Sequence, residues 1–497
     1  MDEPDNDRPA RRAPRPVRAF AVVAAALALT TGMSVALVSV DDSEPAPSAS
    51  PAPDVPPSPE PSGEPQQEER KEPPLVVRAG APDVYDFAGD VRDCASSRRS
   101  FPGAAGTPGF EDDVARISES VERIRGLELE DPVDTRLVSR EEIGRRFAQG
   151  LGRQYSPREA AIDERILGAL GLVPDGIDLW TLSQQVAAGT AAGFYNPRTK
   201  RLYARASGAT LTPYDEVVLA HEIDHALVDQ VLRLPGTLGT DPMLADVMLA
   251  HQALAEGDAT LAMSKYGAGT LDRSALDAFL GRFSSPLITA YPGVPYFLQR
   301  GSGFPYYEGM LFACAAWKRG GWDAIDDMYR RPPGSTAEII FPWRYRRDAS
   351  GELPPSPPAL GESWRRMLVG SFGAFDLMVM LENADVLRTG RAVPGSHVRD
   401  VRGWNGGVLS AWGAGDRTAV HISLLDAGVT GDGRRRRSLC GVLRGWVERT
   451  FRAAYPLQHD PDVWLLDDGF GGLRCDGSSV RVALAPSEGV VRALLRP

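Results

Sequence analysis

The sequence predicts an α+β protein that is mainly helical, with a small α+β domain at its C-terminus and a single transmembrane helix near its N-terminus. Three observations lead to this prediction. An uncharged apolar run covers residues 19–40, helical patterns dominate residues 130–370, and short alternating segments follow after residue 370. The 497 residues, of which 43% are apolar and 24% are charged, are enough to bury one or two large cores.

The apolar run at residues 19–40 has about the ~20 residues that a helix needs to cross a bilayer. Arginines precede this run, and Asp41 and Asp42 follow it, so the positive-inside bias places residues 1–18 in the cytoplasm as an Arg-rich tail. We therefore expect a single-pass type II signal anchor in the cell membrane, with the rest of the chain extracellular. A cleaved signal peptide is the alternative, although its apolar core is usually only ~7–15 residues long. A buried core helix is the third interpretation.

A proline-rich stretch follows the predicted anchor. Residues 41–74 contain eleven prolines among Ser, Ala and Glu and show no apolar periodicity, so they are expected to form a disordered stalk extending to residue 78. The folded part is then predicted to comprise a large domain at residues 79–370 and a small α+β domain at residues 371–497.

The large domain is predicted to begin with an extended segment and two capped helices. Residues 135–138 have the composition of a strand, and Ser139 is suited to cap the helix that follows. Ser156 precedes a proline and opens a second helix that should end near Gly171. Residues 192–205 then predict a hairpin of two short strands, with Asn-Pro at its turn.

The strongest chemical signal is the string HEIDH. Thr212 and Pro213 give a cap and a first helical residue, and a helix of about five turns should follow. On this helix His221 and His225 are four residues apart, so both can reach one metal ion from the same face, with Glu222 beside them. Zinc accepts neutral imidazole nitrogens, and a catalytic site has three protein ligands and one position for water.

The third ligand is expected on the helical stretch of residues 243–266. Glu256 is the preferred candidate because a carboxylate completes a set of two histidines and one glutamate. His251 is the rival, but it lies about 140° around the helix from Glu256, so the two cannot share one ion. Asp258 is better suited to accept a hydrogen bond from a ligand imidazole than to bind the metal itself.

Several segments in order resemble one group of proteins, the uncharacterised bacterial membrane-anchored or secreted gluzincin-type zinc metallopeptidases with an EGDA segment. The resemblance covers residues 130–380 and is carried by YSPREAAIDERILGALGLVP, GFYNPRTKRLYA, VVLAHEIDHALVDQ, ALAEGDATLA and PYYEGMLFACAAWKRGGWDAIDDMYRRPPGSTAEIIFP. It implies a zincin-like fold and one Zn2+ per chain, held by His221, His225 and Glu256. It also implies that Glu222 is general base and acid, and that an edge strand near Gly193 lines the cleft.

The chain departs from this group at Asp224, where such helices more commonly carry a neutral residue. Asp224 lies about 100° around the helix from His225, and we expect it to face solvent. The reaction also needs a donor for the oxyanion, for which Tyr306 or Tyr307 is a candidate because a phenol can donate one hydrogen bond. Packing of this aromatic pair against a helix beginning near residue 305 is the competing interpretation.

The four cysteines allow three disulfide pairings, and the sequence does not choose among them. Cys440 with Cys475 is the preferred pair. Cys314 lies in an apolar stretch, where a buried free thiol is at least as common as a bridge. Cys94 as a thiol that blocks the metal has no supporting motif.

The C-terminal domain is predicted from short segments. Residues 371–390 look helical, residues 403–416 read as a Gly- and Trp-rich turn region, and His421 falls in an alternating strand where it is expected to be structural. The other predicted elements are a helix at 438–455 and strands at 462–466 and 480–484. The run of four arginines from Arg434 is expected to form a solvated loop.

The composition also bounds the function. The formal charge of −11 argues against nucleic acid as a partner. We therefore expect a membrane-anchored extracellular zinc metallopeptidase that acts on a protein or peptide substrate through a zinc-activated water. The alternative is a catalytically silent zincin-like protein that binds or scaffolds components of the envelope. An amidase acting on cell-wall peptide would use the same chemistry.

Overall fold

The computed structural model describes eleven ranges of the chain. They are residues 94–95, 109–190, 193–205, 211–235, 241–284, 293–346, 353–354, 357, 359–391, 393–428 and 438–496. The predicted tail, transmembrane segment and stalk lie outside these ranges, as does the run of arginines from Arg434. Among the described residues, no helix has both the length and the apolar composition needed to cross a membrane.

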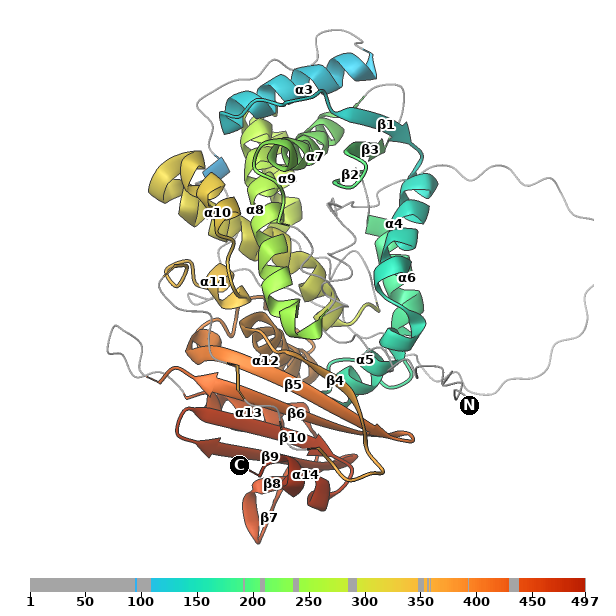
Figure 1. The fold of residues 1–497 in the computed structure, drawn as a ribbon, viewed down its shortest axis with the longest axis vertical. Coiled ribbons are helices and arrows are strands. Elements are labelled where there is room, and N and C mark those ends of the chain that lie inside the picture. Colours follow the sequence, from blue (N-terminus) through green and yellow to red (C-terminus); the bar gives the residue numbers. More distant parts are fainter. Residues whose placement is uncertain are drawn as a thin grey trace, which may run out of the picture.

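A large helical part and a twisted sheet lie one above the other (Figure 1). The helical part contains α3 (Phe110–Arg125), α4 (Arg140–Gln154), α5 (Pro157–Ala169), α6 (Leu179–Thr190), α7 (Pro213–Val231), η1 (Pro242–Leu244), α8 (Ala245–Thr270), α9 (Arg273–Ser284), α10 (Tyr296–Arg330) and α11 (Thr336–Ile340). A three-stranded sheet, in the order β1-β3-β2, lies beside α7 and is built from β1 (Asp134–Val138), β2 (Gly193–Asn196) and β3 (Arg201–Arg205).

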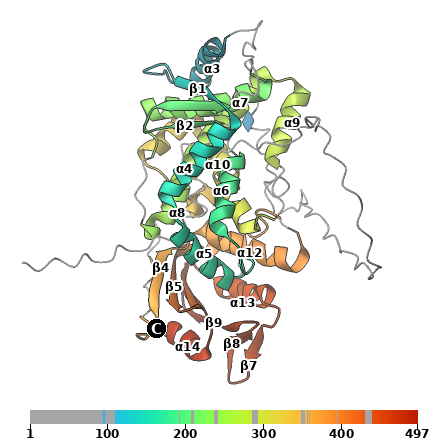
Figure 2. The same cartoon turned by 90° about the vertical axis from the view of Figure 1, so that its right-hand side faces the viewer.

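The lower part is built on a seven-stranded antiparallel sheet. Its elements are β4 (Arg365–Ser371), α12 (Ala374–Thr389), η3 (Asp400–Gly403), β5 (Trp404–Ala414), β6 (Arg417–Asp426), α13 (Leu439–Thr450), β7 (Tyr455–Leu457), β8 (Asp460–Leu466), β9 (Gly469–Asp476), β10 (Ser479–Ala485) and α14 (Glu488–Leu494). The strands follow the order β4-β5-β6-β10-β9-β8-β7. Figure 2 shows α13 and α14 beside this sheet.

The expected fold class is therefore wrong. The sequence predicted a mainly helical chain with a small α+β appendage, whereas one large seven-stranded antiparallel sheet organises the C-terminal part. The predicted turn region at residues 403–416 is the eleven-residue strand β5. Residues 403–416 were predicted to form turns because they are rich in glycine. At Gly407 the chain passes so close to the Phe372 carbonyl oxygen that a Cβ would lie 2.4 Å from it, so this glycine allows close packing rather than a turn.

Most of the local start signals act as predicted. The Ser156 side chain accepts from the backbone N–H of Glu159, whose carboxylate accepts from Ser156 in return, and Pro157 is the first residue of α5. Thr212 and Asp215 make the same arrangement at the start of α7. The helix expected near residue 305 is an exception, because α10 already begins at Tyr296.

Most of the core is one large apolar cluster that contains buried residues from α3 through β10, and a second, smaller cluster lies on the opposite face of the seven-stranded sheet. The sheet's inner face contributes Leu409 and Ile422 to the large cluster, beside α12 and α13, while Trp412 on the outer face packs with Leu494 of α14. Two disulfides tie distant segments together, Cys94 with Cys314 and Cys440 with Cys475. The preferred pair is therefore confirmed, Cys314 is no free thiol, and Cys94 is not available to block a metal.

Candidate metal centre

Helix α7 carries the two histidines of the HEIDH string on one buried face. Pro213 and the Thr212 cap fix where the helix begins, and its regular turn then brings His221 and His225 to the same side. Both histidines and Glu222 are buried, although they are charged or polar. Buried polar groups need partners, so this face of α7 must be satisfied by neighbouring elements or by a bound ion.

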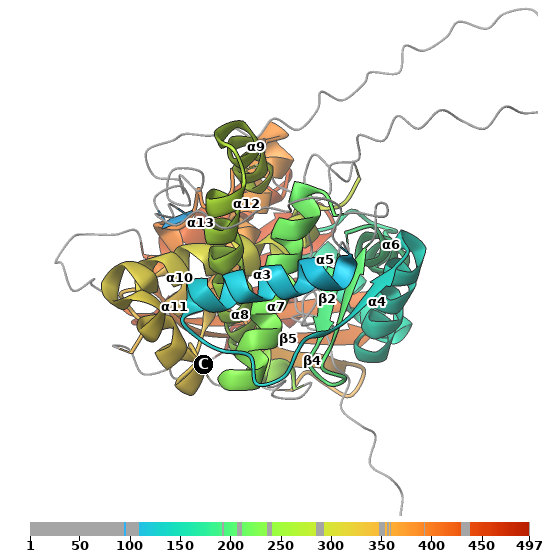
Figure 3. The same cartoon turned by 90° about the horizontal axis from the view of Figure 1, so that it is seen from above.

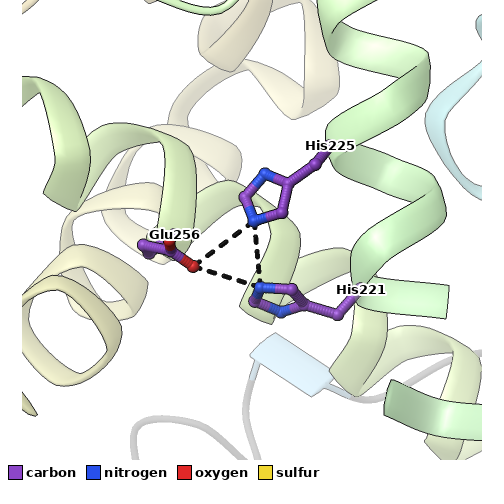
Figure 4. Close-up of side chains that lie close together, drawn as sticks. All are labelled: His221, His225 and Glu256. Atoms are coloured by element: carbon purple, nitrogen blue, oxygen red, sulfur yellow. Dashed lines mark hydrogen bonds and ion pairs between the residues drawn. The ribbon is translucent and has the colours of Figure 1, made fainter. Parts of the chain in front are cut away.

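The partner is Glu256 on α8, the helix that runs alongside α7 (Figures 1 and 3). Figure 4 shows the two imidazoles and the carboxylate converging from the two helices. The Glu256 oxygen lies 3.1 Å from the His221 Nε2 and 3.3 Å from the His225 Nε2, and the two nitrogens are 3.1 Å apart. The sequence-predicted set therefore comes together as a group that could hold a metal ion.

The donor set fits a tetrahedral zinc ion. With bonds of about 2.0–2.1 Å and tetrahedral angles, two ligand atoms lie roughly 3.3–3.4 Å apart, close to the 3.1–3.3 Å found between these three atoms. Two imidazole nitrogens and one carboxylate are also the ligand types that catalytic zinc sites use. Three donors leave a fourth tetrahedral position for a water or a substrate oxygen.

The buried Glu256 carboxylate favours a positive charge on the groups beside it. Although burial disfavours its charged form, the Glu256 carboxylate raises the pKa of His225. The two histidines in turn lower the pKa of Glu256 against the effect of its own burial. Either a proton or a metal ion can supply the positive charge, and a metal that binds here must displace that proton.

Helix α8 reaches this position through an unusually close contact with α10. A Cβ added at Gly257 would lie 2.2 Å from the carbonyl carbon and oxygen of Gly309, and one added at Gly309 would lie 2.2 Å from the carbonyl oxygen of Ala253. Only glycine at both places allows this backbone approach. Because Gly257 directly follows Glu256, the crossing also fixes the third donor. The EGDA segment thus combines a candidate metal ligand with a packing requirement.

Glu222, the expected general base, is held by the edge strand β2. Its Oε2 accepts a hydrogen bond of 2.9 Å from the backbone N–H of Tyr195. Gly193 belongs to the same strand, and a Cβ there would lie 3.5 Å from the Glu222 Cγ, so β2 follows this side chain closely. The resemblance implied an edge strand at Gly193, and β2 is an edge strand of its sheet.

Of the two candidate oxyanion donors, Tyr306 lies beside the group of His221, His225 and Glu256 that could hold a metal ion. Its ring is stacked against that of His221, with the centroids 6.2 Å apart, and it is 8% exposed. Tyr307 leaves the helix about 100° further around the axis. Its ring lies over Gly303, where a Cβ would come within 2.7 Å of it, and burial raises its pKa well above the usual range. The structure thus brings Tyr306 rather than Tyr307 to the side of His221.

Asp224 is buried, so the expectation of a solvent-facing residue is wrong. It accepts a hydrogen bond of 2.9 Å from the Nε of Arg125, which reaches it from α3. The Nη2 of the same arginine lies 3.1 Å from Asp258 on α8 and 3.0 Å from Asp326 on α10. Arg125 thus joins α7 and α8, the two helices that carry the candidate metal ligands, at positions next to His225 and close to Glu256.

The Arg125 group was missed in the sequence. Arg125 lies about 100 residues from its nearest carboxylate partner, and nothing in the local pattern of α3 distinguishes it from the exposed Arg123. Asp258 accepts from Arg125 and from the phenol of Tyr329, not from a ligand imidazole as predicted. His251 is not part of the group that could hold a metal.

No protein-family model, no curated protein and no solved structure matches this chain. The case for a function therefore rests on the geometry of the group itself.

Proposed function

We propose that this chain is a zinc-dependent metallopeptidase in which His221, His225 and Glu256 bind one Zn2+ and Glu222 is general base and acid. The observation that carries the proposal is the convergence of three donor atoms from two helices to within 3.1–3.3 Å of one another. Such a set seldom arises from packing alone, because burying three polar groups together is costly unless an ion or a proton satisfies them. A protein or peptide is the expected substrate.

The mechanism assigns roles to the metal-binding residues, to Glu222 and to Tyr306. His221, His225 and Glu256 would hold the zinc ion, which would lower the pKa of a bound water toward ~7 and polarise the scissile carbonyl. Glu222 takes the proton of the attacking water and later delivers it to the departing amine. The phenol of Tyr306, which lies beside His221, donates a hydrogen bond to the oxygen of the tetrahedral intermediate.

We also propose that the folded part works outside the cytoplasm. All four cysteines are paired, Cys94 with Cys314 and Cys440 with Cys475. Disulfides form and persist mainly in oxidising compartments. They therefore favour an extracellular location, as the charge asymmetry around residues 19–40 does.

A catalytically silent metal-binding protein of the envelope is a second candidate. The side chains of His221, His225 and Glu256 are only 2–3% exposed, and the Oε2 of Glu222 accepts from Tyr195. A structural metal site is expected to be closed in this way, whereas a catalytic site keeps one position open to substrate.

Hydrolysis distinguishes the two candidates. The zinc-loaded full chain is incubated with a library of internally quenched peptides, next to Glu222→Gln and Tyr306→Phe variants that retain their zinc. We expect the wild type to cleave members of the library, Glu222→Gln to lose at least a thousandfold in kcat, and Tyr306→Phe to lose about tenfold to a thousandfold. Zinc binding without cleavage of any peptide would favour the silent protein.

A further inference from the structure

The edge strand β2 is attached to α7 at two points. The backbone N–H of Tyr195 donates to the Oε2 of Glu222 over 2.9 Å. The phenol of the same residue donates to the Oδ2 of Asp229 over 2.8 Å. Asp229 lies one helical turn beyond His225, so both contacts are made to the helix that carries two metal ligands.

The second contact is reinforced by a cation. The Nζ of Lys200, in the hairpin turn before β3, lies 2.7 Å from the same Asp229 oxygen. Tyr195 is only 1% exposed, and its phenol remains a hydrogen-bond donor because burial and the neighbouring Asp229 carboxylate raise its pKa well above the usual range. The Lys200 side chain, in contrast, is 58% exposed, so its ion pair with Asp229 is weakened by water. Tyr195 is therefore the principal link between the hairpin and α7.

We infer that Tyr195 is a positioning residue for the general base: its backbone N–H orients the Glu222 carboxylate, and its phenol, anchored on Asp229, holds the strand in place for that contact. The inference rests on the proposed function. A glutamate side chain has three rotatable bonds, so an exposed one samples many orientations. A single buried N–H donor in a fixed strand selects one of them, and the two-point attachment keeps the donor still.

The edge position of β2 explains why this donor is available. In an antiparallel pair, alternate residues direct their backbone groups toward the partner strand and away from it. Phe194 and Asn196 alternate with Tyr195 along β2, and β3 lies on one side only. The N–H of Tyr195 thus points to α7 instead of entering the ladder. Side-chain substitution at residue 195 leaves this N–H in place and tests the phenol anchor alone.

The test uses Tyr195→Phe, with Tyr155→Phe as the matched control. Tyr155 is equally buried at 1% exposure, and its phenol donates to the buried carboxylate of Asp163 over 2.9 Å, but it belongs to the α4–α5 connection. Each variant therefore loses one phenol-to-aspartate hydrogen bond. The measurements are zinc content, kcat and KM with the quenched peptides that the wild type cleaves, and hydrogen–deuterium exchange of the peptide covering residues 193–196.

We expect Tyr195→Phe to keep one zinc per chain, to lower kcat about tenfold with little change in KM, and to exchange faster at residues 193–196. Tyr155→Phe should match the wild type in all three measurements, whatever its melting temperature. Lys200→Met, at an exposed position, should lower kcat by a smaller factor with the same KM. It serves as the test if Tyr195→Phe does not fold.

Three outcomes would overturn the inference. Unchanged kcat in folded Tyr195→Phe and Lys200→Met would show that the anchor does not position Glu222. A loss of kcat that only follows a loss of zinc would assign Tyr195 to metal binding or stability. Zinc binding and slow exchange at residues 193–196 in a wild type that cleaves no peptide would instead refute the proposed function, leaving the Tyr195 contact as a purely structural feature.

Discussion

Arg125→Met should destabilise the protein strongly, because it removes a buried cation that lies among three carboxylates. The guanidinium is fully buried and lies within 2.9–3.1 Å of oxygens from Asp224, Asp258 and Asp326. It also stacks over the ring of Trp322 at 4.3 Å. Methionine keeps much of the apolar stem but leaves the carboxylates without their partner.

The expected loss is about 3 kcal/mol. Removing one member of a buried ion pair typically costs ~3–5 kcal/mol, because an uncompensated charge stays behind in a poorly hydrated place. The lower end of this range applies here because burial raises the pKa of Asp258 even with Arg125 beside it, which makes it easier for this carboxyl to take up a proton once the guanidinium is gone. Asp326 is partly exposed and keeps some of its hydration.

The assay is guanidinium unfolding of the full chain followed by tryptophan fluorescence, with Arg123→Met as the control. Arg123 lies on the same helix, but its side chain is 51% exposed, its ion pair with the Glu119 carboxylate is 3.9 Å long, and its 3.1 Å hydrogen bond to the Glu119 carbonyl oxygen is exposed, so its loss should change the free energy of unfolding by less than about 0.5 kcal/mol. Adding Asp258→Asn to Arg125→Met should restore part of the loss. A change below about 1 kcal/mol for Arg125→Met, or a double variant that is less stable still, would refute this account.

Three further predictions concern other parts of the molecule. Hydrogen bonds to two aspartates outweigh burial and raise the pKa of His397 to about 9. The stabilising effect of protonated His397 is therefore complete below about pH 6.5 and is lost as the pH rises toward 9. His397→Gln should remove this pH dependence from the melting temperature. Burial lowers the pKa of His421 to about 3, so the fold loses stability as the pH falls below about 6.5; His421→Leu should flatten that acid limb, and an unchanged limb would contradict the assignment. Gly257→Ala should cost more than about 3 kcal/mol in unfolding experiments, because its Cβ would lie 2.2 Å from the backbone of Gly309; a folded variant of normal stability would disprove the close crossing of α8 and α10.

The local structure around the metal group could be predicted because its signals are short-range. Caps at Ser156 and Thr212 and the four-residue spacing of His221 and His225 depend on neighbouring residues only. The helical repeat showed only that Glu256 and His251 cannot bind the same ion; the preference for Glu256 came from the ligand types of catalytic zinc sites, and Glu256 is the residue that lies beside the two histidines.

The incorrect predictions concern features that depend on contacts between segments far apart in the sequence. Asp224 shows a helical position typical of the surface, yet α3 covers it and supplies the Arg125 partner. Residues 404–414 contain glycines that suggest turns, yet they form β5, an inner strand of the sheet with close backbone contacts. The Tyr195 contact to Glu222 depends on how a hairpin docks on α7, and no local pattern encodes docking.

Zinc stoichiometry tests the central claim most directly. The full chain, dialysed against zinc and then against metal-free buffer, is analysed for bound metal next to His221→Ala, Glu256→Gln and His251→Ala. His251 is a partly buried histidine on the same helix as Glu256 and serves as the matched control. The account predicts one zinc per chain in the wild type and in His251→Ala, none in His221→Ala, and a weakened site in Glu256→Gln. Equal zinc in all four proteins, or none in any of them, would contradict it.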